Sequence, residues 1–114
     1  MQESVASPGE HVALATLAAA SLRPVARVIA SDRATDLAFS LSPTRVAVIR
    51  CVEHVTPEHH TALATMLSEG PFIWGAVVYD QGEAPQSPGL IESFHVSQLD
   101  QLVARLVELR EASR

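Results

Sequence analysis

Hydrophobic positions along the chain follow two different periods. Residues 99–109 carry an apolar side chain every three or four positions, the spacing of an amphipathic helix. Residues 45–53 and 72–79 are instead apolar nearly throughout and rich in β-branched side chains, a pattern typical of strands buried on both faces. The pattern therefore predicts helices packed on a sheet, with 45–53 as a central strand.

Three helix starts are visible from their capping residues. Ser7 followed by Pro8 and Glu10 opens a helix that we expect to continue to about Leu22, before Arg23-Pro24. A second helix is predicted from Thr56-Pro57-Glu58 to Gly70-Pro71, and a third from the capping box Ser97-Gln98-Leu99-Asp100. The apolar stripe of the third helix is expected to pack either on the sheet or on a second copy of the chain.

Short apolar stretches between turn residues predict the strands, at 25–30, 34–41, 45–53, 72–79 and 90–96, with a surface loop at 80–89. The element order is then α-β-β-β-α-β-β-α. This order predicts a loose tail at 1–6 and one α/β domain at 7–112, with a mixed sheet of about five strands flanked by helices. The first three strands have short links and should be antiparallel, whereas the helix between 45–53 and 72–79 allows a parallel pair.

The stretch from Ala34 to Val52, ATDLAFSLSPTRVAVIRCV, carries the candidate chemistry. An Asp near the start of one strand, a turn and a hydrophobic strand resemble the restriction-endonuclease-like, or PD-(D/E)xK, superfamily, which includes archaeal-type Holliday-junction resolvases. The resemblance covers residues 10–79. It implies an Asp and a second acid that hold a divalent metal, and a Lys two residues after that acid, on the same strand face, that positions or activates water.

Asp36 matches the first acid of this motif, but the following strand departs from it. One register places the acid and the Lys at Val48 and Arg50, and the other places them at Arg50 and Val52. The resemblance therefore implies a degenerate site in which Asp36 and Arg50 are remnant catalytic positions and no metal is expected. We expect the two to form an ion pair, because an arginine can neutralise a carboxylate that has no metal.

An active metal-dependent nuclease is the alternative interpretation. It would hold Mg²⁺ or Mn²⁺ at Asp36 with Glu53 as a migrated acid, and Glu10 in the first helix would be an auxiliary acid. Glu53 is one residue out of phase with the face of Asp36, and Glu10 also fits a capping box. These mismatches favour the inactive interpretation.

Composition narrows the choice of partners. The net charge is −5, and all eight basic residues are Arg, so no lysine can serve as a base or phosphate ligand. The acidic balance argues against tight binding to duplex DNA. A local patch is the candidate DNA- or RNA-binding surface, and it would consist of Arg23, Arg27, Arg33 and Arg45.

Remaining polar and reactive residues suggest structural roles. The single cysteine, Cys51, lies in a predicted buried strand and is expected in the core, as is Trp74. His59 and His60 are adjacent, face different sides of a helix and match no metal motif. No signal peptide or membrane span is visible, which predicts a cytoplasmic protein without a membrane partner.

We therefore expect a catalytically inactive nuclease-like domain that acts as a binding or accessory module. Its link to nucleic-acid processing comes from the resemblance alone. The further alternative is a homodimeric structural or interaction protein with no ligand, because the strands are apolar and the chain carries little charge.

Overall fold

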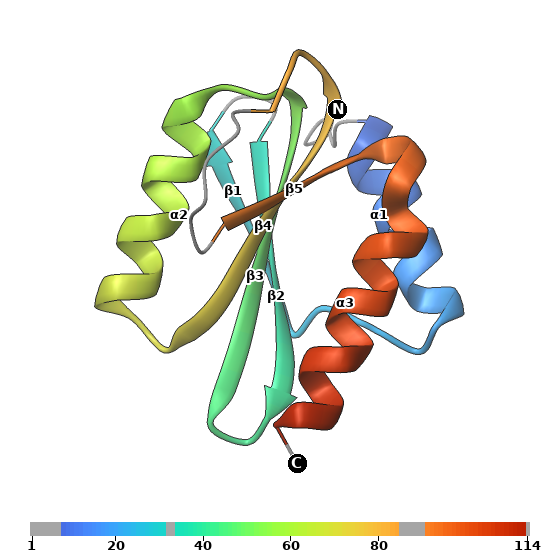
Figure 1. Cartoon of the computed structure of the whole chain (residues 1–114), viewed down its shortest axis with the longest axis vertical. Helices are drawn as coiled ribbons and strands as arrows, with labels where there is room; N and C mark the ends of the chain where they lie inside the picture. The colour runs from blue at the N-terminus through green and yellow to red at the C-terminus, as the bar shows by residue number, and fades with distance from the viewer. Residues whose placement is uncertain (1–7, 32–33, 85–90, 114) are drawn as a thin grey trace, which may run out of the picture.

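A five-stranded sheet runs through the middle of the molecule, and helices cover both of its faces (Figure 1). The computed structural model describes residues 8–31, 34–84 and 91–113. The elements, in chain order, are α1 (Pro8–Ala19), β1 (Ala26–Ser31), β2 (Ala34–Ser42), β3 (Arg45–His54), α2 (Pro57–Glu69), β4 (Phe72–Gln81), β5 (Ile91–His95), the short 3-10 helix η1 (Val96–Gln98) and α3 (Leu99–Ala112). The predicted order and the mixed α/β sheet are confirmed.

The strands lie side by side in the order in which they occur in the chain. β1, β2 and β3 form an antiparallel meander, whereas β3, β4 and β5 run parallel to one another. The apolar strand β3 is central, as its composition predicts. β1 and β5 are the two edges of the sheet.

Two hydrophobic layers hold the helices on the sheet. α1 and α3 cover one face, named here the α1/α3 face, whose core side chains include Leu37, Phe39, Ala47, Ile49, Cys51, Ala76 and Val78. α2 covers the opposite face, named the α2 face, whose core side chains are Ala34, Val48, Val52, Val77 and Ile91. The alternation of side chains along a strand sends neighbouring residues to opposite layers. The apolar stripe of α3 is buried against the sheet through Leu99, Leu102 and Leu106.

The first helix ends earlier than the sequence suggests. α1 ends at Ala19, three residues before the predicted Leu22, and Ser21 adopts a left-handed φ of 63°. The amide of Leu22 donates to the Leu17 carbonyl, and the amide of Ser21 donates to the Ala18 carbonyl. These two bonds form a Schellman motif, which normally uses Gly at the left-handed position. A serine there is not recognised as a helix stop, and the prediction was wrong for that reason.

The third helix also starts differently from the prediction. His95, and not Ser97, is the N-cap of η1, and its Nδ1 accepts a hydrogen bond from the Ser97 amide. The side chain of Gln98 accepts in return from the His95 amide, so the capping box belongs to His95 and Gln98. The η1 turn then passes directly into α3 at Leu99. A histidine cap lacks the usual sequence signature of Ser, Thr, Asp or Asn.

α2 begins after Thr56 with Pro57 in its first turn and ends before Gly70, as predicted. The predicted tail at 1–6, the N-cap Ser7, Arg33 and the second half of the loop at 80–89 lie outside the described residues.

Candidate functional site around Asp36 and Arg50

Asp36 and Arg50 face each other across the central hairpin. They are directly paired in the register of β2 and β3, so their side chains leave the sheet on the same face. The Nε of Arg50 donates to Oδ1 of Asp36 at 2.7 Å, and the second guanidinium nitrogen donates to Oδ2 at 2.9 Å. The side chain of Arg50 is only 12% exposed and that of Asp36 only 10%. The expected ion pair is therefore present, with the bidentate geometry that arginine and carboxylate favour.

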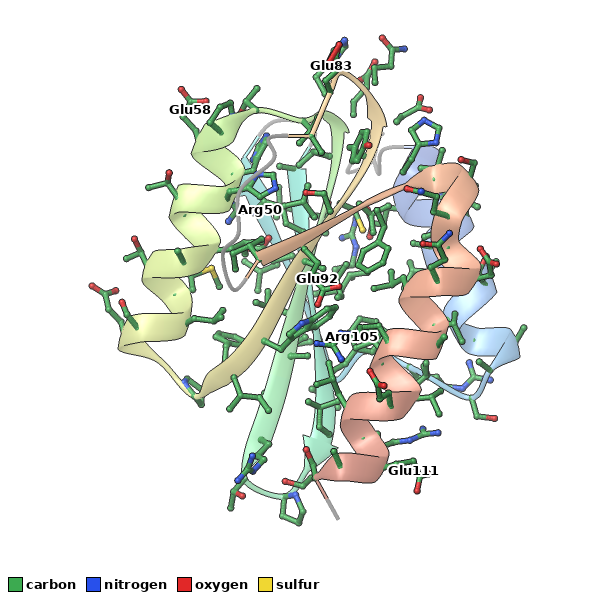
Figure 2. All side chains as sticks on the ribbon, in the orientation of Figure 1. Arg50, Glu58, Glu83, Glu92, Arg105 and Glu111 are labelled. Atoms are coloured by element: carbon green, nitrogen blue, oxygen red, sulfur yellow. The ribbon has the colours of Figure 1, made fainter. Side chains whose placement is uncertain are left out.

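The surroundings of this pair are mostly aliphatic. Val28 of β1 is paired with Asp36 in the sheet, and Val77 of β4 is paired with Arg50. The pair lies on the α2 face, and Figure 2 shows Arg50 beside the N-terminal half of α2. Such a position removes most water from the two charges and leaves each as the main partner of the other.

His59 in the first turn of α2 lies within electrostatic reach of the ion pair. Burial lowers its pKa below the usual 6.5, and the positive charge of Arg50 adds to the lowering. The negative charges of Glu58 and Asp36 act in the opposite direction but are smaller contributions. The imidazole is therefore predominantly neutral near neutral pH and adds no positive charge beside the guanidinium.

Neither position at which the motif would place a second metal-binding acid carries one, since one register puts Val48 there and the other puts Arg50. Val48 is 1% exposed and packs in the same cluster as Leu63 of α2. Val52, which stands at the Lys position in the second register, is buried in that cluster as well. The hairpin thus retains Asp36, but buried aliphatic side chains occupy the neighbouring positions on the same face of the sheet.

Glu10 and Glu53 do not join Asp36. Glu53 follows Val52 on β3 and therefore points to the α1/α3 face. Glu10 is fully buried on the same α1/α3 face, where Arg27 of β1 donates to both of its carboxylate oxygens, from Nε at 2.5 Å and from the second nitrogen at 3.1 Å. The sheet consequently separates both glutamates from Asp36.

The four arginines of the expected nucleic-acid patch have different environments. Arg27 is bonded to Glu10, an interaction that raises its pKa, and Arg33 lies outside the described residues. Arg23 and Arg45 are exposed, on the link before β1 and at the first position of β3. Among the residues that the structure describes, the side chains of Arg23, Arg27 and Arg45 are therefore all exposed, although that of Arg27 is bonded to Glu10.

Cys51 lies on the α1/α3 face of β3 and is fully buried. Burial raises its thiol pKa to about 12, with smaller contributions from the negative charges of Glu10 and Asp36. A thiol with this pKa forms almost no thiolate at neutral pH, so Cys51 is a core residue and not a nucleophile.

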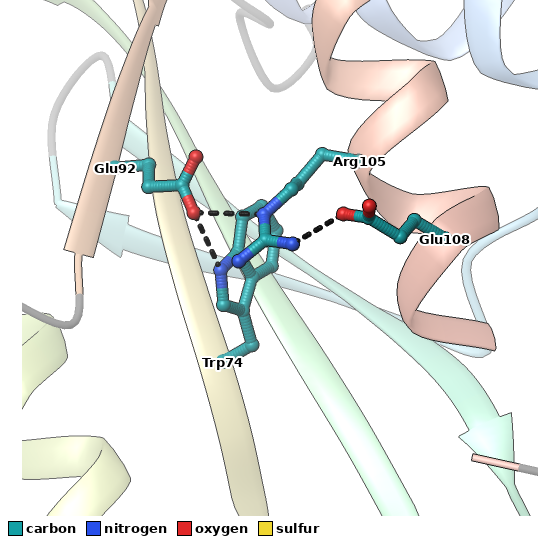
Figure 3. A network of polar contacts seen from close by, with 4 residues as sticks. All are labelled: Trp74, Glu92, Arg105 and Glu108. Carbon is teal, nitrogen blue, oxygen red and sulfur yellow. Dashed lines mark hydrogen bonds and ion pairs between the residues drawn. The ribbon is translucent and has the colours of Figure 1, made fainter. Parts of the chain in front are cut away.

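Sequence reasoning missed a polar network between the sheet and α3 (Figure 3). Glu92 of β5 accepts from the Trp74 indole at 3.1 Å and from Arg105 of α3 at 2.9 Å. The guanidinium carbon of Arg105 lies 5.8 Å from the centre of the Trp74 ring, and Arg105 also donates to Glu108. The sequence contains one indication of this network, the i,i+3 spacing of Arg105 and Glu108, which predicts their contact on one helix.

A second missed contact connects α2 to the β5 edge. His60 Nε2 lies 2.6 Å from the Ser93 hydroxyl, and His60 Nδ1 lies 3.4 Å from the Thr56 carbonyl. Because a carbonyl only accepts, the contact with Thr56 requires a proton on Nδ1, and in that tautomer Nε2 accepts from Ser93. The two contacts fix the ring between the first turn of α2 and β5.

Within residues 8–31, 34–84 and 91–113, no three His, Cys, Asp or Glu side chains are grouped so that they could hold a metal ion. No helix in the same ranges is long and apolar enough to cross a membrane. Comparison with family models, with curated proteins and with solved structures gives no significant match.

Proposed function

We propose that this protein is a binding or accessory module without catalytic activity, built on a hairpin that resembles the restriction-endonuclease-like superfamily. The observation that supports this proposal is the state of Asp36, whose two carboxylate oxygens both accept hydrogen bonds from Arg50. The carboxylate that would hold a catalytic metal is already neutralised by an internal cation.

Metal binding at Asp36 would require this pair to open. Removing the partner of a buried ion pair typically costs about 3–5 kcal/mol, because the remaining charge is left without compensation. Mg²⁺ binds proteins through one or two carboxylates and retains several waters, so it would gain little from a single, mostly buried Asp36. With Val48 and Val52 in the core, no second carboxylate on this strand face offsets that cost.

Association with DNA or RNA is the more specific part of the proposal. It is supported by the resemblance and by the exposure of Arg23 and Arg45. The net charge of −5 favours weak, salt-sensitive contacts over tight duplex binding.

A metal titration combined with a cleavage assay tests the absence of catalysis. The wild-type protein, Asp36→Asn and the surface control Asp100→Asn are titrated with Mn²⁺ and incubated with labelled single- and double-stranded DNA. We expect the three proteins to bind Mn²⁺ equally weakly and to leave the DNA intact. Mn²⁺-dependent cleavage that Asp36→Asn abolishes and Asp100→Asn retains would overturn the proposal.

A binding assay tests the nucleic-acid part by itself. Fluorescence anisotropy of labelled DNA and RNA is measured at low ionic strength with the wild type and with the Arg23→Ala/Arg45→Ala double variant. We expect weak binding that salt abolishes and that the double variant reduces. If neither nucleic acid binds at low salt, the module acts on another class of partner.

A further inference from the structure

The edge strand β1 is exposed on both of its faces. Val28, which points to the α2 face, is 59% exposed, and Ile29, which points to the α1/α3 face, is 57% exposed. Neither helix layer therefore reaches over this strand. The outer side of β1 has no strand partner among the described residues, so its outward backbone groups are available for pairing.

β1 has little of the usual protection of an edge strand. A register shift between Ile29 and Ser31 interrupts its pairing with β2 near the end, but the pairing from Ala26 to Ile29 is regular. Proteins commonly guard exposed edges with a charged side chain, a proline or a covering element. The sequence of β1, ARVIAS, contains no proline and one charged residue, Arg27. The guanidinium of Arg27 is bonded to Glu10 on the α1/α3 face, so its charge is neutralised within the chain.

The opposite edge of the sheet is guarded. On one face of β5, Glu92 is bonded to Trp74 and Arg105. On the other face, Ser93 is bonded to His60, and the strand ends at His95, which caps η1. Because these polar side chains already form hydrogen bonds within the chain, they disfavour the addition of an apolar strand at β5.

We propose that two copies of this protein associate through β1, in antiparallel pairing across a two-fold axis, to form one continuous sheet. The inference deepens the proposed binding function, on which it rests, by naming the partner as a second copy of the chain. Self-pairing of β1 uses the same surface on both copies and closes at a dimer. Pairing of β1 with β5 would be open-ended, and the polar β5 edge opposes it.

Charge and the alternation of side chains along β1 both fit this occupant. Since Glu10 neutralises Arg27, two β1 edges meet without repulsion between like charges. With the two-fold axis at Val28, the alternation of the strand places Arg27 opposite the partner's Ile29 on the α1/α3 face. Val28 then lies opposite the partner's Val28, where two β-branched side chains form a favourable cross-strand pair.

Sedimentation equilibrium of the full chain tests the association. Val28→Lys places a charge at the centre of the proposed interface, whereas Val12→Lys places one at an exposed valine of α1, outside the paired strand. We expect the wild type and Val12→Lys to form dimers, and Val28→Lys to raise the dimer dissociation constant by about tenfold or more. Equal dimerisation of the two folded variants would overturn the role of β1.

Cross-linking gives a second readout that does not depend on tolerance of the lysine. Val28→Cys should form a disulfide-linked dimer under mild oxidation, because directly opposed residues of an antiparallel pair have Cα atoms about 4.5–5.5 Å apart. Val12→Cys should stay monomeric in the denaturing gel, and the buried Cys51 should not compete. Equal cross-linking of the two variants would reject the pairing.

The outcomes separate this inference from the proposed function. If the wild type is monomeric at all concentrations and Val28→Cys gives no specific cross-link, self-association is rejected. The proposed non-catalytic function is unaffected by that result, because the metal titration tests it separately. If an apolar peptide strand instead binds the monomer and Val28→Lys blocks it, the edge has a different occupant and the second-copy inference is wrong.

Discussion

Asp36 on β2 and Arg50 on β3 are bonded through both carboxylate oxygens, at 2.7 and 2.9 Å, inside the layer between the sheet and α2. This ion pair occupies the place where the resemblance to metal-dependent nucleases would put a metal. The positive charge beside Asp36 thus comes from Arg50, which follows the buried Val48 by two residues on the same face of β3. The contribution of the Asp36–Arg50 ion pair to the free energy of unfolding can be measured directly.

We expect Arg50→Met and Asp36→Leu each to lower the free energy of unfolding by about 3–5 kcal/mol, because each removes one partner of a mostly buried pair. The double variant Asp36→Leu/Arg50→Met should recover most of this loss, since no charge remains without a partner. Urea unfolding of the four proteins gives the coupling energy. An Arg50→Met protein as stable as the wild type would show that the pair contributes nothing.

The end of α1 offers a stabilising substitution. Ser21 has a left-handed φ of 63°, a conformation in which only glycine avoids a steric cost. Ser21→Gly should therefore raise the free energy of unfolding by up to about 1 kcal/mol. Ala15→Gly, at an exposed position in the middle of the same helix, should lower it by a similar amount. A loss of stability in both variants would contradict the Schellman motif at Ser21.

The thiol of Cys51 should be inert in the folded protein. Its pKa is raised to about 12, mainly by burial, and the side chain has no access to solvent. We expect an aromatic disulfide reagent to modify it only after addition of denaturant. The exposed control Val12→Cys should react at the rate of a free thiol. Rapid native labelling of Cys51 would show that β3 opens locally.

Acidification should weaken the fold through His59. Burial and Arg50 depress its pKa below the usual 6.5, with His60 adding to the effect and Glu58 and Asp36 opposing it. The unfolded chain therefore binds a proton more readily than the folded one. This contribution to stability is present above about pH 6.5 and is lost as the pH falls through the lower folded pKa.

Replacement of His59 by glutamine should make the unfolding free energy less dependent on pH between about pH 7 and about pH 5. His54→Gln, at the exposed end of β3, is the matched control and should keep the wild-type slope. Chemical unfolding at a series of pH values measures both. Identical slopes in the two variants would remove His59 from the explanation.

Local sequence signals were sufficient for the order of the elements. The apolar period and the turn residues predicted all five strands and the start of α2, because these features depend on neighbours in the chain. Helix boundaries were less accurate at Ser21 and His95, since both residues adopt capping roles for which their side chains are unusual. The Asp36–Arg50 pair was predictable because a short turn sets the register of its hairpin.

Contacts between distant segments were decided only by the tertiary structure. Glu10 binds Arg27, and Glu92 joins Trp74 to Arg105, across layers that no local pattern brings together. The same is true of β1. Its sequence shows an apolar strand, but only the order of strands in the sheet makes it an edge, and only the reach of the helices leaves Val28 and Ile29 exposed. Burial of a side chain depends on the whole fold, whereas the tendency to form a strand is local.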